Sequence, residues 1–368
     1  MPTFHKPAPP ATPGKSLFIH GVAEGTLAEL SCHKKLDVYI RRTKGLGDVL
    51  MAALVSHSLR RKLPPKFCKV HLITSPPYKK LITKLKLVDS VCLDGSSTGS
   101  FIVNLQDKVD YLPHCAAYHR LDLMAMGVGL RPSDVVANYR IKVDPAWGDW
   151  GRTQLKEFGN NRIIALAPWA TAPIRSWPNW EEVVGTLLSR EYAIVLLHNQ
   201  FVKLEKRAGL INLTGRVNIM QLFSVLSQCS AAIVVDSGIL HACGFLGIPF
   251  VGLFGPIDPR FRVKYYGSKE ILFLKDTCKI CPCWDWQMGA CRDVSYYMVC
   301  MKSITPEMVM SSLRKLLSNG KEMKDDTKVG DQSVWGSSSG EFGQVQESGF
   351  GSEAGPGSAA ATHISTLD

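Results

Sequence analysis

The sequence lacks any apolar run that approaches the roughly 20 residues needed to cross a bilayer. Its N-terminal stretch, MPTFHKPAPPATPGKS, also lacks the compact apolar core of a secretory signal peptide. These absences exclude an ordinary transmembrane helix and predict a cytoplasmic protein. The 11 cysteines are therefore expected to be reduced thiols or metal ligands rather than a disulfide framework.

Two motifs with well-defined chemistry are missing as well. The Gly-x₄-Gly-Lys-Ser/Thr phosphate loop does not occur, so no P-loop is predicted. The C-terminal cysteine cluster, CKICPCWDWQMGACRDVSYYMVC, does not have the spacing of a paired C-x₂-C zinc site. We therefore predict no bound metal and favour packed free thiols; the alternative is zinc held by Cys281, Cys283, Cys291 and Cys300.

A length of 368 residues with 45% hydrophobic content is enough for two domains, each with its own core. Residues 1–35 are Pro-rich and then polar, and residues 319–368 are Gly/Ser-rich, so both are expected to be flexible tails. Between them, apolar strand-like runs alternate with helical patterns in two sets, 36–145 and 161–318, joined by a linker over 146–160. This predicts an α/β fold of two doubly wound domains that face each other across a ligand-binding cleft.

Positive charge is concentrated in the first predicted domain. The whole chain has a formal net charge of +11. The segment 41–86 alone carries twelve basic residues against one acid, Asp48. Such a segment attracts phosphorylated small molecules, nucleic acid or an anionic membrane surface, and the alternative is a solvated face with no partner.

The stretch RRTKGLGDV follows the first predicted strand. Gly45 and Gly47 allow a tight turn and a close approach of the backbone to a ligand. Asp48 then begins a helix, where it could be a helix N-cap or a general base for a hydroxyl. Its basic neighbourhood, with Lys44 nearby, would lower its pKa.

A second stretch, APWATAPIRSWPNW, forms a stiff loop after the first strand of the second half. Its cationic tip, Arg175, could hold a diphosphate and stabilise the charge that develops as it leaves. The alternative is a surface arginine stacked on Trp177 or Trp180.

The third stretch, AAIVVDSGILHACG, is a buried parallel strand followed by a helix. Asp236, Ser237 and Gly238 lie where the helix begins, and His241 lies in its first turn. Separately these residues would be a cap, a glycine and a core histidine. Together, at a strand end, they predict an anion site at the helix N-terminus.

These stretches, in this order and with CPC…C…CMKSITPEMV after them, resemble the signature blocks of glycosyltransferase family 9, the lipopolysaccharide heptosyltransferases. The resemblance covers about 36–318. It implies the GT-B architecture, with two Rossmann-like domains, the acceptor bound by the first and the nucleotide sugar by the second. It also implies inversion at the anomeric carbon with no cofactor and no essential metal. The absence of any Asp-x-Asp pair agrees with this, because helix dipoles, Arg and Lys are left to neutralise the diphosphate.

By this resemblance Asp48 matches the proposed general base, and Arg175 stands where the family usually has a phosphate-binding lysine. Thr171 lies near a family residue that contacts phosphate. The donor-loop block is matched by Asp236, Ser237, Gly238 and His241. The chain departs from the family at Lys44, where a small residue is common, and at 239–240, where Pro-Met is usual.

Three hypotheses follow. The first is a transferase that moves a sugar, by family ADP-heptose, to a lipid-linked core oligosaccharide at the inner membrane surface, with which it could associate peripherally. The second keeps the enzyme and takes nucleic acid, such as a modified base, as the acceptor. The third is a catalytically silent nucleotide-binding or scaffolding relative.

Overall fold

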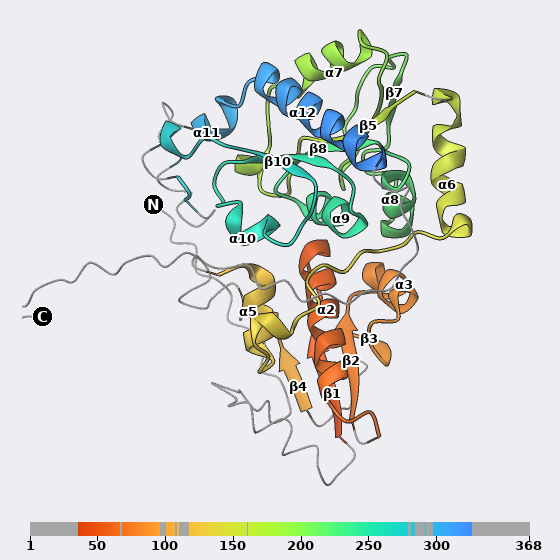
Figure 1. Ribbon diagram of the computed structural model, residues 1–368, viewed down its shortest axis with the longest axis vertical. Helices are drawn as coiled ribbons and strands as arrows, with labels where there is room; N and C mark the ends of the chain where they lie inside the picture. The colour runs from red at the N-terminus through yellow and green to blue at the C-terminus, as the bar shows by residue number, and fades with distance from the viewer. Residues whose placement is uncertain are drawn as a thin grey trace, which may run out of the picture. The chain divides into compact units, whose positions relative to one another are not determined.

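The computed structural model describes 36–66, 68–95, 101–106, 109, 118–159, 161–278, 281–283, 291 and 297–325. The predicted N-terminal tail and the chain beyond 325 lie outside these residues. Among the described residues there are two parallel sheets with helices packed on them (Figure 1). None of the helices in the described ranges is long and apolar enough to cross a bilayer.

The first sheet is built around β1. Its strand order is β3-β2-β1-β4, and β1 pairs in parallel with β2 and with β4. The chain order changes direction beside β1, which places a topological switch point between β1 and β4. The elements are β1 (Leu36–Arg41), α2 (Leu46–Lys62), β2 (Cys68–Thr74), α3 (Pro76–Leu85), β3 (Ser90–Leu93), β4 (Phe101–Asn104) and α5 (Arg120–Gly127).

The second sheet has the order β10-β9-β8-β5-β6-β7, with all of these pairs parallel. Its switch point lies between β5 and β8. The elements are β5 (Ile163–Ala167), α7 (Trp180–Leu188), β6 (Ala193–Leu196), β7 (Leu210–Asn212), α8 (Ile219–Leu226), β8 (Ala231–Val235), α9 (Gly238–Leu246), β9 (Phe250–Phe254), α10 (Arg260–Val263), β10 (Lys269–Phe273), α11 (Val299–Lys302) and α12 (Pro306–Asp325).

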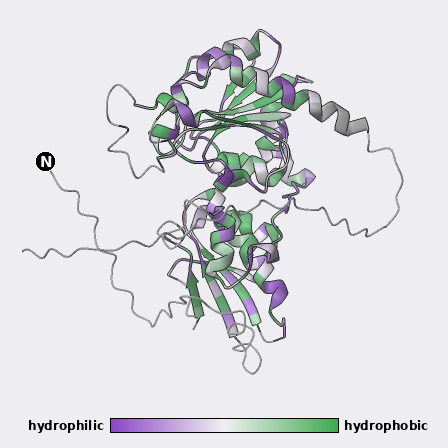
Figure 2. Ribbon diagram, turned by 60° about the vertical axis from the view of Figure 1, so that its left-hand side comes forward, coloured by the Kyte–Doolittle hydropathy of each residue, from purple (hydrophilic) through white to green (hydrophobic). Residues whose placement is uncertain are grey.

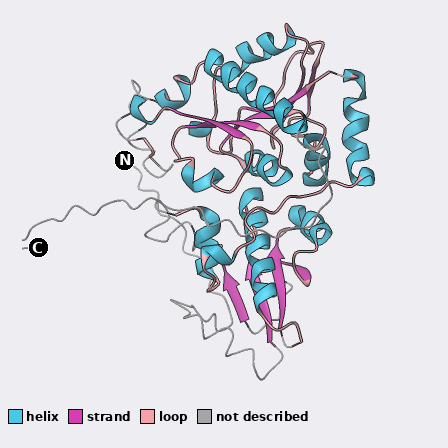
Figure 3. Cartoon of the chain, viewed as in Figure 1, coloured by secondary structure: helices cyan, strands magenta, loops and turns pink. Residues whose placement is uncertain are grey.

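Both faces of the second sheet are covered by helices (Figure 3). Along β5, Ile164 and Leu166 belong to the core cluster that contains residues of α7 and α12. Ala165 and Ala167 belong to the other cluster, which contains residues of α8 and α9. Burial on both faces explains why β5 and β8 are apolar at every position rather than at alternate positions. The same apolar strands appear green in Figure 2.

The predicted linker is a helix in the structure. Residues Pro145–Leu155 form α6, capped by the Asp144 carboxylate, which accepts a hydrogen bond from Trp147 N at 2.7 Å. The glycines of this stretch allow close helix packing: a β-carbon at Gly151 would stand 2.4 Å from the Ser224 carbonyl oxygen on α8. The Asp-Pro pair, an N-cap followed by proline at the first helical position, was the sequence signal for this helix. Helix α12 likewise continues to Asp325, into the segment predicted as a tail.

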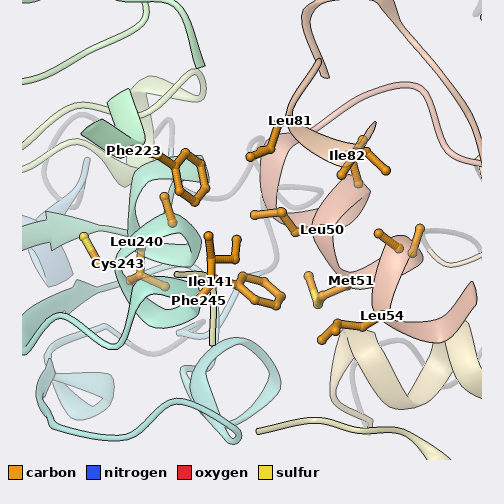
Figure 4. Packing of buried hydrophobic residues seen from close by; sticks show 14 of the residues in the cluster. Leu50, Met51, Leu54, Leu81, Ile82, Ile141, Phe223, Leu240, Cys243 and Phe245 are labelled. Carbon is orange, nitrogen blue, oxygen red and sulfur yellow. The ribbon is translucent and has the colours of Figure 1, made fainter. Parts of the chain in front are cut away.

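One core cluster joins residues of the two sheets' helices. Helix α2 is buried over most of its length, including Leu50, Met51 and Leu54. In Figure 4 these side chains lie opposite Leu240 and Phe245 of α9. A helix that is apolar nearly all round is expected to be buried. The packing of α2 on α9 brings the first turns of both helices to one place, and the site described below is built there.

Candidate active site

A cavity of about 360 Å³ lies where the carboxyl ends of β1, β5 and β8 meet. Its wall includes the first turns of α2 and α9 and the first residue of α5. The structure brings to it nine residues singled out in the sequence: Gly45, Gly47, Asp48, Thr171, Arg175, Asp236, Ser237, Gly238 and His241. Lys44 is exposed and does not line the cavity.

The Asp48 carboxylate is held by two arginines. Arg120 Nη1 donates to both carboxylate oxygens, at 3.0 Å each. The Arg42 guanidinium donates to Oδ2. Arg42 is itself fixed, because its Nη1 donates to the Leu105 carbonyl at 3.1 Å and its Nε to the Lys44 carbonyl at 3.2 Å. Of the two arginines, Arg120 is the one that also lines the cavity.

These contacts set the charge of Asp48. Burial by itself would raise the pKa of the carboxyl, but the guanidinium groups of Arg120 and Arg42 outweigh burial, and the pKa lies below its ordinary value. Asp48 is therefore an anion at neutral pH. The N-cap interpretation of this residue is wrong, because α2 begins at Leu46, Gly45 is the cap, and no side chain caps the helix.

Asp236 is a second carboxylate of the cavity wall and, unlike Asp48, it is buried. Arg175 Nη1 donates to its Oδ2 at 3.3 Å and to its backbone oxygen at 3.2 Å, and Arg262 Nε lies 3.8 Å from Oδ1. Burial would raise the pKa of Asp236, but Arg262 and Arg175 lower it below the ordinary range. The predicted alternative for Arg175, stacking on tryptophan, gives way to this ion pair; Trp177 is buried and donates to the Ile304 carbonyl instead.

The first turn of α9 presents polar groups to the cavity. Gly238 begins the helix, and a β-carbon there would stand 3.1 Å from Leu46 Cβ on α2. The Ser237 Oγ is buried and has no hydrogen-bond partner among the described residues. An unpaired hydroxyl beside free helix N–H groups is suited to a phosphate oxygen.

His241 also lines the cavity, and both carboxylates act on it. Burial lowers the pKa of His241 to about 4, against the raising effects of Asp236 and Asp48, so the imidazole is neutral at physiological pH. Its Nδ1 forms a hydrogen bond of 2.7 Å with the Tyr266 hydroxyl. The histidine is thus neither a free base nor a simple core residue.

Sequence reasoning missed most of the cations in this site. Arg42 was counted only as part of the basic segment, although it stands within RRTKGLGDV. Arg262 follows the conspicuous GPIDP stretch by three residues, which was a usable signal. Arg120 had none, because it reaches Asp48 across 72 positions of sequence. With these residues the site has four arginines against two carboxylates, a net positive charge that suits a ligand with about two negative charges.

The positive charge of the basic segment 41–86 is partly neutralised in the folded structure by acids from elsewhere in the chain. Four of its cations pair with acids from outside the segment, in the ion pairs Arg41–Asp94, Arg60–Asp89, Lys62–Asp134 and Lys84–Asp144. The count of charged residues within 41–86 did not include these acids because they lie later in the chain. The large uncompensated charge that motivated the nucleic-acid hypothesis is reduced accordingly.

Other candidates lie outside the cavity. Glu205 is exposed, stands in a loop and does not line the cavity. Cys281 donates to the Gly255 carbonyl at 3.0 Å, and Cys283, Cys291 and Cys300 are buried. Within the described residues no group of three or more His, Cys, Asp or Glu side chains is arranged to hold a metal ion.

Part of the chain is similar in sequence to a family of known proteins. Residues 122–284 match the family described as glycosyltransferase family 9 (heptosyltransferase). Lipooligosaccharide heptosyltransferase 2 of Haemophilus influenzae is 25% identical over 174 residues, which are 44% of this chain and 49% of that protein. The chain thus spans about half the length of the curated relatives it matches. Asp48 lies outside the family match, so its role depends on geometry.

Solved structures show the same fold. ADP-heptose lipopolysaccharide heptosyltransferase II of Escherichia coli superposes with a TM-score of 0.62 at 15% identity, covering 78% of this chain and 100% of that one. A family 9 glycosyltransferase of Veillonella parvula gives 0.63 at 15% identity, covering 78% and 98%. The predicted two-sheet GT-B fold is confirmed. Sequence, curated relatives and fold point the same way: residues 122–284 match glycosyltransferase family 9, and the chain is similar to heptosyltransferases.

Proposed function

We propose that this protein is an inverting glycosyltransferase that moves a sugar from a nucleoside diphosphate to an acceptor hydroxyl. One observation carries the proposal: a half-buried anionic carboxylate, Asp48, faces a phosphate-type site at the start of α9 across a single cavity. This is the arrangement that a displacement needs, with a base on one side of the reacting carbon and charge stabilisation on the other.

The donor diphosphate would lie on the α9 side. Arg175 and Arg262 supply charge, and the first turn of α9 supplies free backbone N–H groups. The Ser237 hydroxyl lacks a partner among the described residues and can donate to a phosphate oxygen. We propose that these groups neutralise the leaving diphosphate and that no metal ion is required. The names of the relatives favour heptose as the sugar and ADP as the nucleotide carrier.

The acceptor would lie on the α2 side. Asp48 removes the proton of the acceptor hydroxyl, and the oxygen attacks the anomeric carbon from the face opposite the diphosphate. The bond between that carbon and the diphosphate oxygen breaks, the diphosphate takes the electron pair, and the proton stays on Asp48 until it is released to water. Inversion follows because attack and departure occur on opposite faces.

Arg120 gives the acceptor side a cation at the cavity wall. Its side chain is 18% exposed, against 5% for Arg42. An acceptor with an anionic group near the reacting hydroxyl would suit this position. A lipopolysaccharide core would be an acceptor of this kind. No observation on the described residues favours nucleic acid over such an acceptor.

The test is a panel of nucleotide sugars, including ADP-heptose, incubated with the full chain and followed by mass spectrometry. We expect release of the nucleoside diphosphate, as transfer with a core acceptor and as slow hydrolysis without one. Release from no member of the panel, under conditions where the protein is folded, would refute the proposal.

A further inference from the structure

Tyr266 is packed against the helix that carries His241. It follows α10, is buried, and its ring lies so close to α9 that a β-carbon at Gly244 would stand 2.4 Å from its Cγ. Phe245 and Phe250 contact the same ring edge-on, with centroids 5.7 and 6.3 Å away. The phenol is therefore held on several sides, and its hydroxyl has a defined position.

The hydroxyl lies 2.7 Å from His241 Nδ1, and either atom could be the donor. Burial raises the pKa of Tyr266, so the phenol keeps its proton. If Nδ1 donated, the phenol proton would need a second acceptor, and the described residues offer it no other hydrogen bond. A buried donor left without an acceptor is unfavourable. The hydroxyl is thus the better donor.

The charges around the imidazole favour the same arrangement. The groups that act on His241 are Asp236, Asp48, Arg262 and Arg120, and the two carboxylates act more strongly than the two arginines. Nε2 is the ring nitrogen that Tyr266 does not engage, and the stronger influence of the carboxylates favours an N–H group there over a lone pair. Among the described residues Nε2 has no hydrogen-bond partner, and His241 lines the cavity.

We propose that Tyr266 is a positioning residue that donates to Nδ1 of His241 and thereby fixes the neutral imidazole with its proton on Nε2. The Nε2–H group then faces the cavity as a hydrogen-bond donor for an anionic oxygen of the ligand. The role of that donor in turnover rests on the proposed transferase function; the tautomer does not.

The tautomer is measured first, on the ligand-free full chain. Long-range ¹H–¹⁵N NMR of the histidine rings, with His241 assigned by loss of its signals in His241→Gln, should show a protonated Nε2 and an unprotonated Nδ1. A protonated Nδ1, or an averaged mixture of both forms, would overturn the proposal whether or not the protein transfers sugar.

Turnover then tests what the tautomer does. Glutamine places an N–H group near the position of Nε2, and asparagine near that of Nδ1. We expect His241→Gln to keep donor turnover within about tenfold of wild type and His241→Asn to lose about 100-fold, the cost of one missing transition-state donor. Equal losses in both variants would contradict an Nε2–H donor.

Tyr266→Phe removes the phenol proton and should lower turnover about tenfold, the size of one net hydrogen bond. Tyr192→Phe is the matched control. Tyr192 packs on the core cluster that contains residues of α7 and α12, away from the cavity, and its replacement should leave turnover unchanged. In Tyr266→Phe the Nδ1 resonance should also move to the position of a nitrogen without a hydrogen-bond donor. An unmoved resonance would show that the hydroxyl does not donate.

Discussion

Gly47 lies directly against the imidazole of His241. A β-carbon at position 47 would stand 2.2 Å from His241 Cδ2, well inside any real contact. Position 47, at the start of α2, must therefore be glycine because the imidazole of His241 on α9 leaves no space for a β-carbon. The two motifs are separated in sequence and fit together only in the fold.

Gly47→Ala should therefore displace His241 and the start of α2. We expect overpacking to lower the free energy of unfolding by about 1–3 kcal/mol. Donor turnover should fall further than that loss of stability explains, which paired urea titration and activity assays would show. Gly185→Ala is the matched control: Gly185 is in α7 and has no atom within 4 Å of an added β-carbon. That change should be neutral or stabilising by up to about 1 kcal/mol.

Asp48→Asn keeps the shape of the side chain and removes the base. We expect kcat to fall by about 10² to 10⁴-fold, the usual contribution of a general base. Donor affinity, measured by isothermal titration calorimetry, should change little because Asp48 lies on the acceptor side. Asp149→Asn, at an exposed carboxylate on α6, controls for the loss of charge. A variant that turned over at the wild-type rate would show that another group takes the proton.

Arg175 should matter for the donor and not for the acceptor. Replacement by alanine removes a charge from the α9 side, and we expect the donor Kd to rise about 10- to 100-fold, as for a charged hydrogen bond. Arg175→Lys, which restores the residue type usual in the family, should recover part of this loss. Arg190→Ala, an exposed arginine after α7, is the comparison. Equal effects of Arg175→Ala and Arg190→Ala on Kd would remove Arg175 from the donor site.

Stability should fall between pH 6.5 and about 4. Burial lowers the pKa of both His119 and His241 from 6.5 to about 4 in the folded chain. In that window the unfolded chain binds a proton that the folded chain does not. The contribution to stability is therefore complete above pH 6.5 and is lost as the pH falls, by about 3 kcal/mol per histidine at pH 4.

His119→Asn isolates one of these histidines. His119 caps α5 by accepting from Leu121 N at 3.1 Å through Nδ1, and asparagine can accept the same bond. The variant should match wild type at pH 7.5 and be more stable than wild type at pH 4.5, as measured by urea titration. Parallel curves for the two proteins over this pH range would show that His119 does not titrate as expected.

The sequence was sufficient to predict features that depend on residues close together in the chain. Apolar runs that are buried on both faces marked β5 and β8, and the polar residues after them had to lie at one sheet edge. That is why Arg175, Asp236 and His241 could be assigned to one edge, whereas Asp48, which follows a strand of the other sheet, was joined to them with the help of the family resemblance.

The sequence was insufficient to predict contacts between residues that are far apart in the chain. Arg120 reaches Asp48 across 72 positions, and Tyr266 reaches His241 across 25, and no local pattern marks either residue. The glycines and tryptophans of 146–160 suggested a break, although they serve close packing of α6 on α8. Charge counted in a sequence window likewise missed the acids that neutralise it.

The most direct measurement is a crystal structure of the full chain with ADP bound. We expect the diphosphate between Arg175 and the first turn of α9, within hydrogen-bond distance of Ser237 Oγ and His241 Nε2, with open space toward Asp48. A nucleotide bound elsewhere, or a diphosphate on the Asp48 side of the cavity, would contradict this expectation.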